Sequence, residues 1–535
     1  MRNRHIGKVL LVLLLANAAT ILFFRYFTTV DGPLHVLHAS LLKAPWSTTS
    51  HAAHGFVYDS GVQRALLGDW ILAALLAFAT PERAHDLIMV LASCMVVVSV
   101  FAFLHVHGVK VGLSILLLAP LLFSSLLIMG LFHFQLGTAL ALGTVVWWKW
   151  HKHPPYIRWI GLLIGVVISV FTNRGAPFLL CLFFVPFFLF DLFKDWKIAL
   201  AGDRRSKVFR IAWPIVLLLL LGAFLMDRSM RMPTLYLPAV TPSFTHDFLL
   251  RPLFLLDHTK ELGVVRALGV LFLIAGIAGS FGRWRSGRKL FWHDLLIVIM
   301  ITLSAISFFG NTPHGRLFII SDRAQWLALV VLVLWLVAIA GTSPGSIARI
   351  ISGAALCALP LHVIRLVQAE EFLSQFEPAH NATMEACAVL APHSLVFPVV
   401  SRPDRMLQHE LSYVALRHSG VLIAPKEQLH FLGPHTWSAG GPWHRFASDP
   451  YWLMRHWRRG LPPEVDQVLF VGEGMEQQVL KHPWPSLLSG RFKQTFDNGY
   501  ARIYTATTNA GHEYQSENTL SRPKTGLQFW VDVRR

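Results

Sequence analysis

The sequence predicts a mainly α-helical, polytopic membrane protein with about 11 to 13 transmembrane helices and a small α/β domain at its C-terminal end. Of its 535 residues, 54% are hydrophobic and only 14% are charged. Soluble domains carry roughly 25% charged residues, so this chain is too apolar to bury its hydrophobic side chains in one aqueous core. Long apolar runs recur as far as residue 366, and strand-length runs replace them beyond it.

The apolar runs define the expected membrane spans. A hydrocarbon core of about 30 Å requires about 20 apolar helical residues. Runs of this character lie at 9–26, 66–80, 87–106, 111–130, 134–149, 157–172, 175–193, 211–227, 263–281, 293–309, 325–341 and 347–366. The first follows a basic start, and no convincing small-residue cleavage site precedes Asp31, so we expect a retained signal anchor.

The basic residues predict the orientation of the chain. Its 47 Lys and Arg against 30 Asp and Glu give a formal charge of +17, and much of the excess lies in short loops between apolar runs. This pattern is typical of cytoplasmic loops and argues against a nucleic-acid-binding protein. It predicts a cytoplasmic N-terminus and places 27–66, 173–175, 227–262, 310–324 and everything after 367 outside. An odd number of crossings is then required, so one run between 66 and 149 must be split, re-entrant or non-spanning.

The C-terminal part has a different pattern. The short hydrophobic runs SLVFPVV, GVLIAP, VDQVLFVG and ARIYTAT alternate with helical or loop stretches. This alternation favours strands and helices in one small domain. We therefore expect a membrane domain at 1–366, with a first outer loop at 27–66, and an extracytoplasmic α/β domain at 367–535.

The stretch DGPLHVLH, residues 31–38, opens the first outer loop. Asp followed by Gly-Pro is a common turn, so Asp31 has one interpretation as a simple cap or turn residue. The other interpretation is a general base at the membrane boundary. The predicted topology favours the second, because several cations lie on the same side.

Histidines raise the question of a metal ion. His35 and His38, and also His51 and His54, are three residues apart, a spacing that puts both imidazoles on one helical face. Asp31 and Asp59 could add oxygen ligands to such a site. With 26 histidines in the chain, such pairs also arise by chance. A divalent metal ion and isolated polar histidines both remain open, and His38 is expected on the helix surface.

Cations on the predicted outer segments favour a phosphate ligand. A charge close to the apolar layer usually has a partner, and the planar guanidinium of arginine binds phosphate with two hydrogen bonds. Snorkelling of each side chain to the ordinary lipid surface is the alternative. The polar outer residues that form this candidate substrate site are Arg64, His133, Asn173, Arg174, His314, Arg316 and Arg323.

The layout resembles the GT-C superfamily of polytopic glycosyltransferases, especially bacterial relatives of the protein mannosyltransferases and aminoarabinose transferases. The resemblance depends on DGPLH at 31–35 and on FHFQLG at 132–137, and it covers roughly residues 1–366. Asparagine is the more usual polar residue at the position of His133. The mannosyltransferase branch often has a second acid at the position of Gly32, for which Asp59 is the proposed substitute.

The resemblance implies an inverting glycosyltransferase that takes its sugar from a polyprenyl phosphate on the outer face of a bacterial cytoplasmic (inner) membrane. Asp31 would be the general base, and His35 would orient it or the substrate, or bind a metal in the branches that use one. Arg174, Arg316 or Arg323 would neutralise the departing phosphate. The acceptor would be a glycan, lipid or protein, and the other partners membrane lipids. The alternatives are another lipid-phosphate enzyme, including a metal-dependent hydrolase, a transporter or flippase, and a non-catalytic assembly protein for a lipid-linked glycan.

Overall fold

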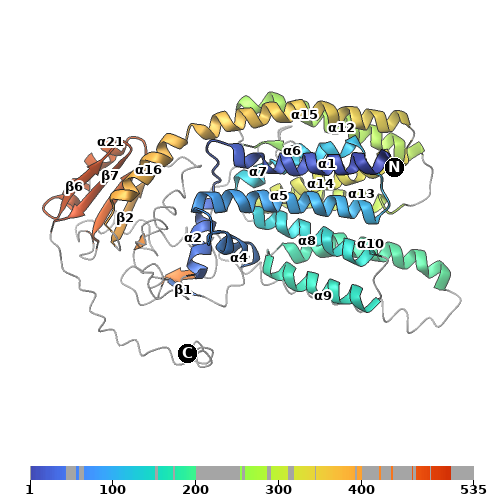
Figure 1. The fold of residues 1–535 in the computed structure, drawn as a ribbon, viewed down its shortest axis with the longest axis horizontal. Coiled ribbons are helices and arrows are strands. Elements are labelled where there is room, and N and C mark those ends of the chain that lie inside the picture. The colour runs from blue at the N-terminus through green and yellow to red at the C-terminus, as the bar shows by residue number, and fades with distance from the viewer. Residues whose placement is uncertain are drawn as a thin grey trace.

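A bundle of long helices forms the larger part of the molecule, and a small sheet lies beyond one end of it (Figure 1). The computed structural model describes residues 2–43, 56–58, 66–150, 155–172, 175–199, 253–255, 259–285, 291–310, 318–343, 345–391, 394–400, 421–422, 435–437, 461, 465–481 and 484–507.

The bundle helices correspond to the apolar runs of the sequence. They are α1 (Arg2–Ala19), α5 (Pro81–Val106), α8 (Phe132–Lys149), α9 (Pro155–Thr172), α10 (Ala176–Ala199), α12 (Leu262–Arg285), α13 (Asp294–Gly310), α14 (Phe318–Thr342) and α15 (Gly345–Ser374). The side chain of Thr80 caps α5, whose first residue is Pro81, a combination that favours helix initiation. α14 is the most enclosed of the long apolar helices, and Trp326 in it is fully buried.

Length and composition support a multi-pass membrane protein. Within the described residues, five helical stretches are long and apolar enough to cross a bilayer: His5–Phe23, Pro81–Val106, Leu262–Arg285, Asp322–Thr342 and Gly345–Val389. Four shorter apolar stretches accompany them: Leu113–Ile128, Tyr156–Thr172, Ala176–Asp191 and Asp294–Ser307. The run at 211–227 lies outside the described residues, so the total of 11 to 13 spans stays a prediction.

Two runs between 66 and 149 differ from simple spans. The run at 66–80 forms only α4 (Leu66–Leu75), and ten residues at 1.5 Å each reach about 15 Å, half of a bilayer core. The run at 66–80 is therefore too short to span, in the region where the basic loops require one run to be split, re-entrant or non-spanning. The run at 111–130 is broken into η3 (Leu113–Leu118), α6 (Ala119–Leu122) and α7 (Ser125–Ile128). α4 packs against α2 (Gly32–Lys43) at the end of the bundle that faces the sheet (Figure 1).

The C-terminal part is a mixed sheet between helices. Its strands are β2 (Leu395–Val400), β3 (Val421–Leu422), β5 (Gln467–Val471), β6 (Phe492–Asp497) and β7 (Ala501–Ala506), in the order β3-β2-β5-β7-β6. β2 is parallel to β3 and β5, whereas β7 is antiparallel to β5 and β6. One apolar cluster joins the sheet to α21 (Met475–Leu480) and α22 (Trp484–Leu488), and another joins it to α16 (Glu377–Val389). The predicted α/β domain is confirmed, and β6 is a strand that the sequence pattern did not indicate.

Several contacts connect the bundle to this domain. α15 continues across residue 366 to Ser374, and α16 follows it toward the sheet (Figure 1). The predicted domain boundary at 366 thus lies inside a helix and stays a prediction. Arg25, in the segment after α1, forms an ion pair with Glu377 of α16 at 2.5 Å. β1 (Phe56–Tyr58) in the first loop pairs with β4 (His435–Trp437) of the C-terminal part.

Candidate functional site

The Asp31 turn is the first component of the candidate site. Asp31 immediately precedes α2, and its backbone oxygen accepts a hydrogen bond from His35 N at 3.1 Å, as a helix-initiating residue does. The segment before it is fixed by a 2.8 Å hydrogen bond from Val30 N to Ile128 O. Gly130 has φ +81° and lies so close to the turn that a Cβ on it would be 3.1 Å from Gly32 N. The broken run at 113–128 therefore serves to hold the DGP turn in place.

Gly32 has a steric reason to be glycine. A Cβ at this position would lie 2.2 Å from His85 Nε2 and 2.3 Å from Thr29 Oγ1. These two atoms are 2.9 Å apart and hydrogen-bond each other inside the protein. A second acid after Asp31, as in the mannosyltransferase branch, would displace this pair. In this chain the corresponding space is occupied by His85 from α5.

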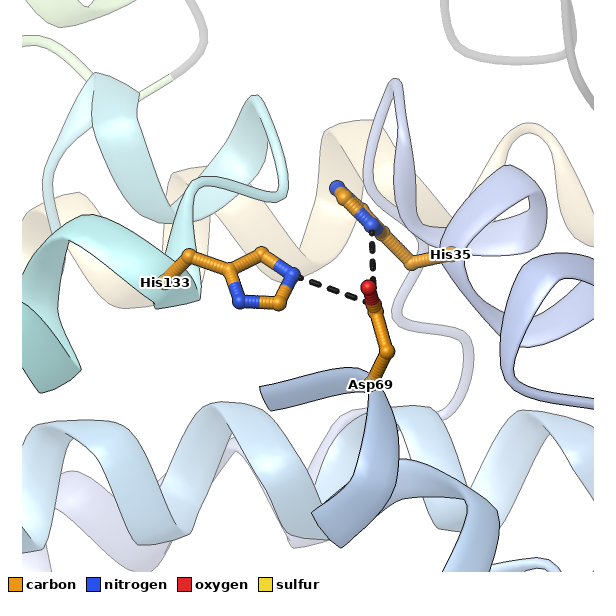
Figure 2. A group of neighbouring side chains, drawn as sticks. All are labelled: His35, Asp69 and His133. Carbon is orange, nitrogen blue, oxygen red and sulfur yellow. Dashed lines mark ion pairs between the residues drawn. The ribbon is translucent and has the colours of Figure 1, made fainter. Parts of the chain in front are cut away.

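Three imidazoles lie around the carboxylate of Asp69 in α4. Its Oδ2 is 3.0 Å from His38 Nδ1, while its Oδ1 is 3.2 Å from His133 Nε2 and 3.6 Å from His35 Nδ1. Figure 2 shows His35 and His133 converging on this carboxylate from α2 and α8. Burial alone would raise the pKa of Asp69, but the charges of His133 and His38 outweigh it and hold the pKa well below its ordinary value.

In the described part of the chain, one group could hold a metal ion: His35, Asp69 and His133, whose donor atoms lie within 4.8 Å of one another. The expectation for His38 was wrong, since its side chain is buried against Asp69 and does not lie on the helix surface. The physical reason is that the partner acid belongs to α4, which packs across α2.

The FHFQLG motif begins α8 and lies at the junction of these elements. The Phe132 ring contacts His35 at 5.1 Å, and the His133 ring lies 4.9 Å from the same imidazole. Gln135 Oε1 accepts a long hydrogen bond of 3.5 Å from Ser93 on α5. A Cβ on Gly137 would lie 3.0 Å from Ala176 Cβ, so this glycine permits close packing against the start of α10.

Arg323 brings a cation to the same end of the bundle. It lies in the second turn of α14, where it interacts electrostatically with Asp31 and with its neighbour Asp322. Its guanidinium carbon is 5.8 Å from the centre of the Phe134 ring, within cation–π range. The structure thus brings together four of the sequence-predicted residues, namely Asp31, His35, His133 and Arg323.

The other candidates lie outside the described residues. These are Asp59, Arg64, Asn173, Arg174, His314 and Arg316, as well as His51 and His54 of the second histidine pair.

Sequence reasoning missed Asp69 and His85. Asp69 had a detectable signal, because a lone acid in the apolar stretch LLGDWILAALL requires a partner. His85 had no comparable signal, since it lies among charged residues at the start of a helix.

Comparison with known proteins finds likeness in structure only. No protein-family model and no curated protein sequence matches the chain. The crystal structure of ArnT from Cupriavidus metallidurans bound to undecaprenyl phosphate superposes with a TM-score of 0.52 and 13% identity, covering 93% of this chain and 97% of that one. The same protein in its apo state gives a TM-score of 0.46, 14% identity and the same coverage.

The likeness to the lipid-bound structure extends over nearly the whole of both chains. The predicted resemblance is therefore confirmed at the level of the fold alone: the chain is a polytopic membrane protein whose fold is that of ArnT.

Proposed function

We propose that the protein is a membrane glycosyltransferase that moves a sugar from a polyprenyl-phosphate donor to a hydroxyl group of a glycan, lipid or protein. The observation that carries this proposal is that the negative charge of Asp31, which immediately precedes α2, acts on Arg323 in the second turn of α14. An acid and a cation at one end of a GT-C bundle suit a base and a phosphate-binding group. The related fold of ArnT, crystallised with undecaprenyl phosphate, supports a lipid-phosphate donor.

The proposed reaction is a single displacement. The Asp31 carboxylate accepts the proton of the acceptor hydroxyl, and the acceptor oxygen forms a bond to the anomeric carbon. The bond from that carbon to the donor phosphate breaks on the opposite face, which inverts the anomeric centre. The polyprenyl phosphate leaves with the electron pair, and Arg323 stabilises the charge that develops on it. His35, one turn after Asp31, orients the base or the acceptor.

The remaining assignments belong to the same proposal. Asp59 acts as the second acid, and further substrate contacts come from Arg64, His133, Asn173, Arg174, His314 and Arg316. The protein would lie in a bacterial cytoplasmic membrane, with a cytoplasmic N-terminus and the C-terminal domain on the outer side. The basic short loops support this orientation.

The test is transfer by purified protein from a panel of polyprenyl-phosphate sugars to membrane extracts. Asp31→Asn removes the basic carboxylate but keeps the size and shape of the side chain, so we expect kcat to fall about 10²- to 10⁴-fold. Asp191→Asn is the matched control: Asp191 pairs with Lys149 between α10 and α8, away from the Asp31 turn, so transfer should persist. Undiminished transfer by Asp31→Asn would refute the mechanism. Binding of undecaprenyl phosphate by wild type without turnover of any sugar would favour the transporter or assembly protein.

A further inference from the structure

The cluster of His35, Asp69 and His133 has a geometry that sugar transfer by Asp31 and Arg323 does not require. We propose that these three side chains bind a divalent transition-metal ion of the zinc class. The ligand atoms are His35 Nδ1, His133 Nε2 and Asp69 Oδ1, which come from α2, α8 and α4 (Figure 2). This inference stands on the cluster alone and does not depend on the proposed sugar transfer.

The first argument is the state of the ligand atoms. His35 Nδ1, His133 Nε2 and Asp69 Oδ1 are each buried without a hydrogen-bond partner among the described residues. The contacts of 3.2 and 3.6 Å from the two imidazoles to Oδ1 are ion-pair contacts that fall short of hydrogen-bond geometry. An unsatisfied buried polar group costs about 1–3 kcal/mol. One cation between the three atoms would satisfy all of them together.

The second argument is distance. Zinc binds imidazole nitrogen and carboxylate oxygen at about 2.0–2.2 Å, so neighbouring ligand atoms in a tetrahedral site are about 3.3–3.5 Å apart. The measured separations of 3.2 and 3.6 Å bracket this value, and no pair of the three exceeds 4.8 Å.

The third argument is the support around the carboxylate. His38 Nδ1 contacts the other oxygen, Asp69 Oδ2, at 3.0 Å, and so fixes the orientation in which Oδ1 faces His35 and His133. Hydrogen bonding of a ligating carboxylate by an outer group is a regular property of metal sites. His35 and His38 thus have different tasks, and the H-x-x-H pair does not chelate as a unit.

The ligand set also defines the chemical class of the ion. Two imidazoles and one carboxylate suit zinc and similar first-row transition metals better than Mg²⁺ or Ca²⁺, which prefer oxygen. Three protein ligands leave a fourth tetrahedral position for water or an anionic oxygen, as in catalytic zinc sites. Gly68 makes this geometry available, since a Cβ there would lie 2.3 Å from His133 Nδ1.

The test measures metal binding by full-length protein in detergent, without any sugar donor. Metal is removed with a chelator, and Co²⁺ and then Zn²⁺ are titrated in. We expect one equivalent of Co²⁺ to give the visible absorption of a four-coordinate site, and Zn²⁺ to displace it. Asp69→Asn and His133→Asn should lower the affinity at least tenfold. Gly68→Ala keeps all ligands but pushes the His133 ring, and should lower affinity as well.

His107→Asn is the matched control, because His107 lies at the other end of α5 with its Nδ1 against Phe103 O. It should bind Co²⁺ like wild type. Wild-type protein that binds neither ion would overturn the proposal, even if a ligand variant fails to fold. Binding that persists unchanged in Asp69→Asn and His133→Asn would also overturn it. Because no donor is present, either result leaves the test of sugar transfer independent.

Discussion

At the scale of single residues, glycines determine how closely the polar groups of the site approach one another. Gly32 leaves room for the Thr29–His85 hydrogen bond beside the Asp31 turn, and Gly68 leaves room for the His133 ring beside α4. Neither has the positive φ of Gly130, so close approach and not backbone conformation is the reason for glycine at both positions. Substitution at such a position acts on the neighbouring side chains first.

Gly32→Ala is predicted to destabilise the protein and to reduce transfer. The added methyl would lie 2.2 Å from His85 Nε2, so the Thr29–His85 pair must separate, at about 1–3 kcal/mol for an overpacked site. Thermal unfolding in detergent should show a lower midpoint.

Gly143→Ala is the control for that change. Gly143 lies inside α8, and apart from the backbone of its own helix no atom of the described residues is within 4 Å of the position where its Cβ would be. Alanine there should keep or raise the midpoint, since it is favoured in helices by about 0.5–1 kcal/mol. Equal midpoints for Gly32→Ala and wild type would contradict the steric argument.

At the scale of elements, the sequence predicted the spanning helices well and the short ones poorly. Runs such as 87–106 and 325–341 form α5 and α14. An apolar run of this length matches the thickness of the bilayer core when it is helical, so the sequence predicts the helix directly. The runs at 66–80 and 111–130 became α4 and a broken segment, since hydropathy does not report which backbone is shielded by neighbouring helices. Within the second segment, Arg365 of α15 donates to the carbonyl oxygens of Pro120 and Phe123, where α6 ends.

Arg365 is fully buried, and its guanidinium donates to the backbone oxygens of Pro120, Phe123 and Leu253. Glu261 provides a nearby negative charge. We predict that Arg365→Leu lowers stability by about 3 kcal/mol or more, because three buried acceptors lose their donors. Arg365→Lys should not restore it, since an ammonium group lacks the planar fork. Unfolding midpoints in detergent and the yield of monodisperse protein measure both effects.

The same helix offers a control. Arg349 is exposed near the start of α15, and its Nε donates a hydrogen bond to Gly345 O at 3.2 Å. Arg349→Ala should change stability by less than about 0.5 kcal/mol. If Arg365→Leu were as mild as Arg349→Ala, the guanidinium would not be what holds the broken segment together.

At the scale of the whole molecule, the resemblance in two short motifs predicted the architecture. The grouping of the three proposed metal ligands could not be predicted. DGPLH and FHFQLG lie side by side, since Phe132 and His133 contact His35. The three ligands come from positions 35, 69 and 133, and no spacing rule relates residues so far apart. Only the packing of α4 across α2 and α8 brings them together. The cations at 174 and 316 lie outside the described residues, so their convergence on Asp31 stays a prediction.

The orientation of the molecule in the membrane gives a last prediction. α1 begins at the end of the bundle far from the sheet, and α15 runs from that end toward the sheet (Figure 1). With a cytoplasmic N-terminus, the sheet must then be extracytoplasmic. The four native cysteines are replaced first, because Cys357 is exposed on α15. Ser346→Cys near the start of α15 and Gln477→Cys on α21 then report opposite sides, since both positions are exposed.

In intact spheroplasts, a membrane-impermeant maleimide should label Gln477→Cys at once and Ser346→Cys only after permeabilisation. The reverse pattern would place the candidate site in the cytoplasm, where a polyprenyl-phosphate sugar facing outward could not reach Asp31. Labelling of both positions from one side would instead contradict a bundle in which α15 crosses the bilayer, because Ser346 lies at the start of α15 and Gln477 lies beyond its end. An odd number of crossings and basic loops on the inner face both require that Gln477→Cys is labelled from outside and that Ser346→Cys is not.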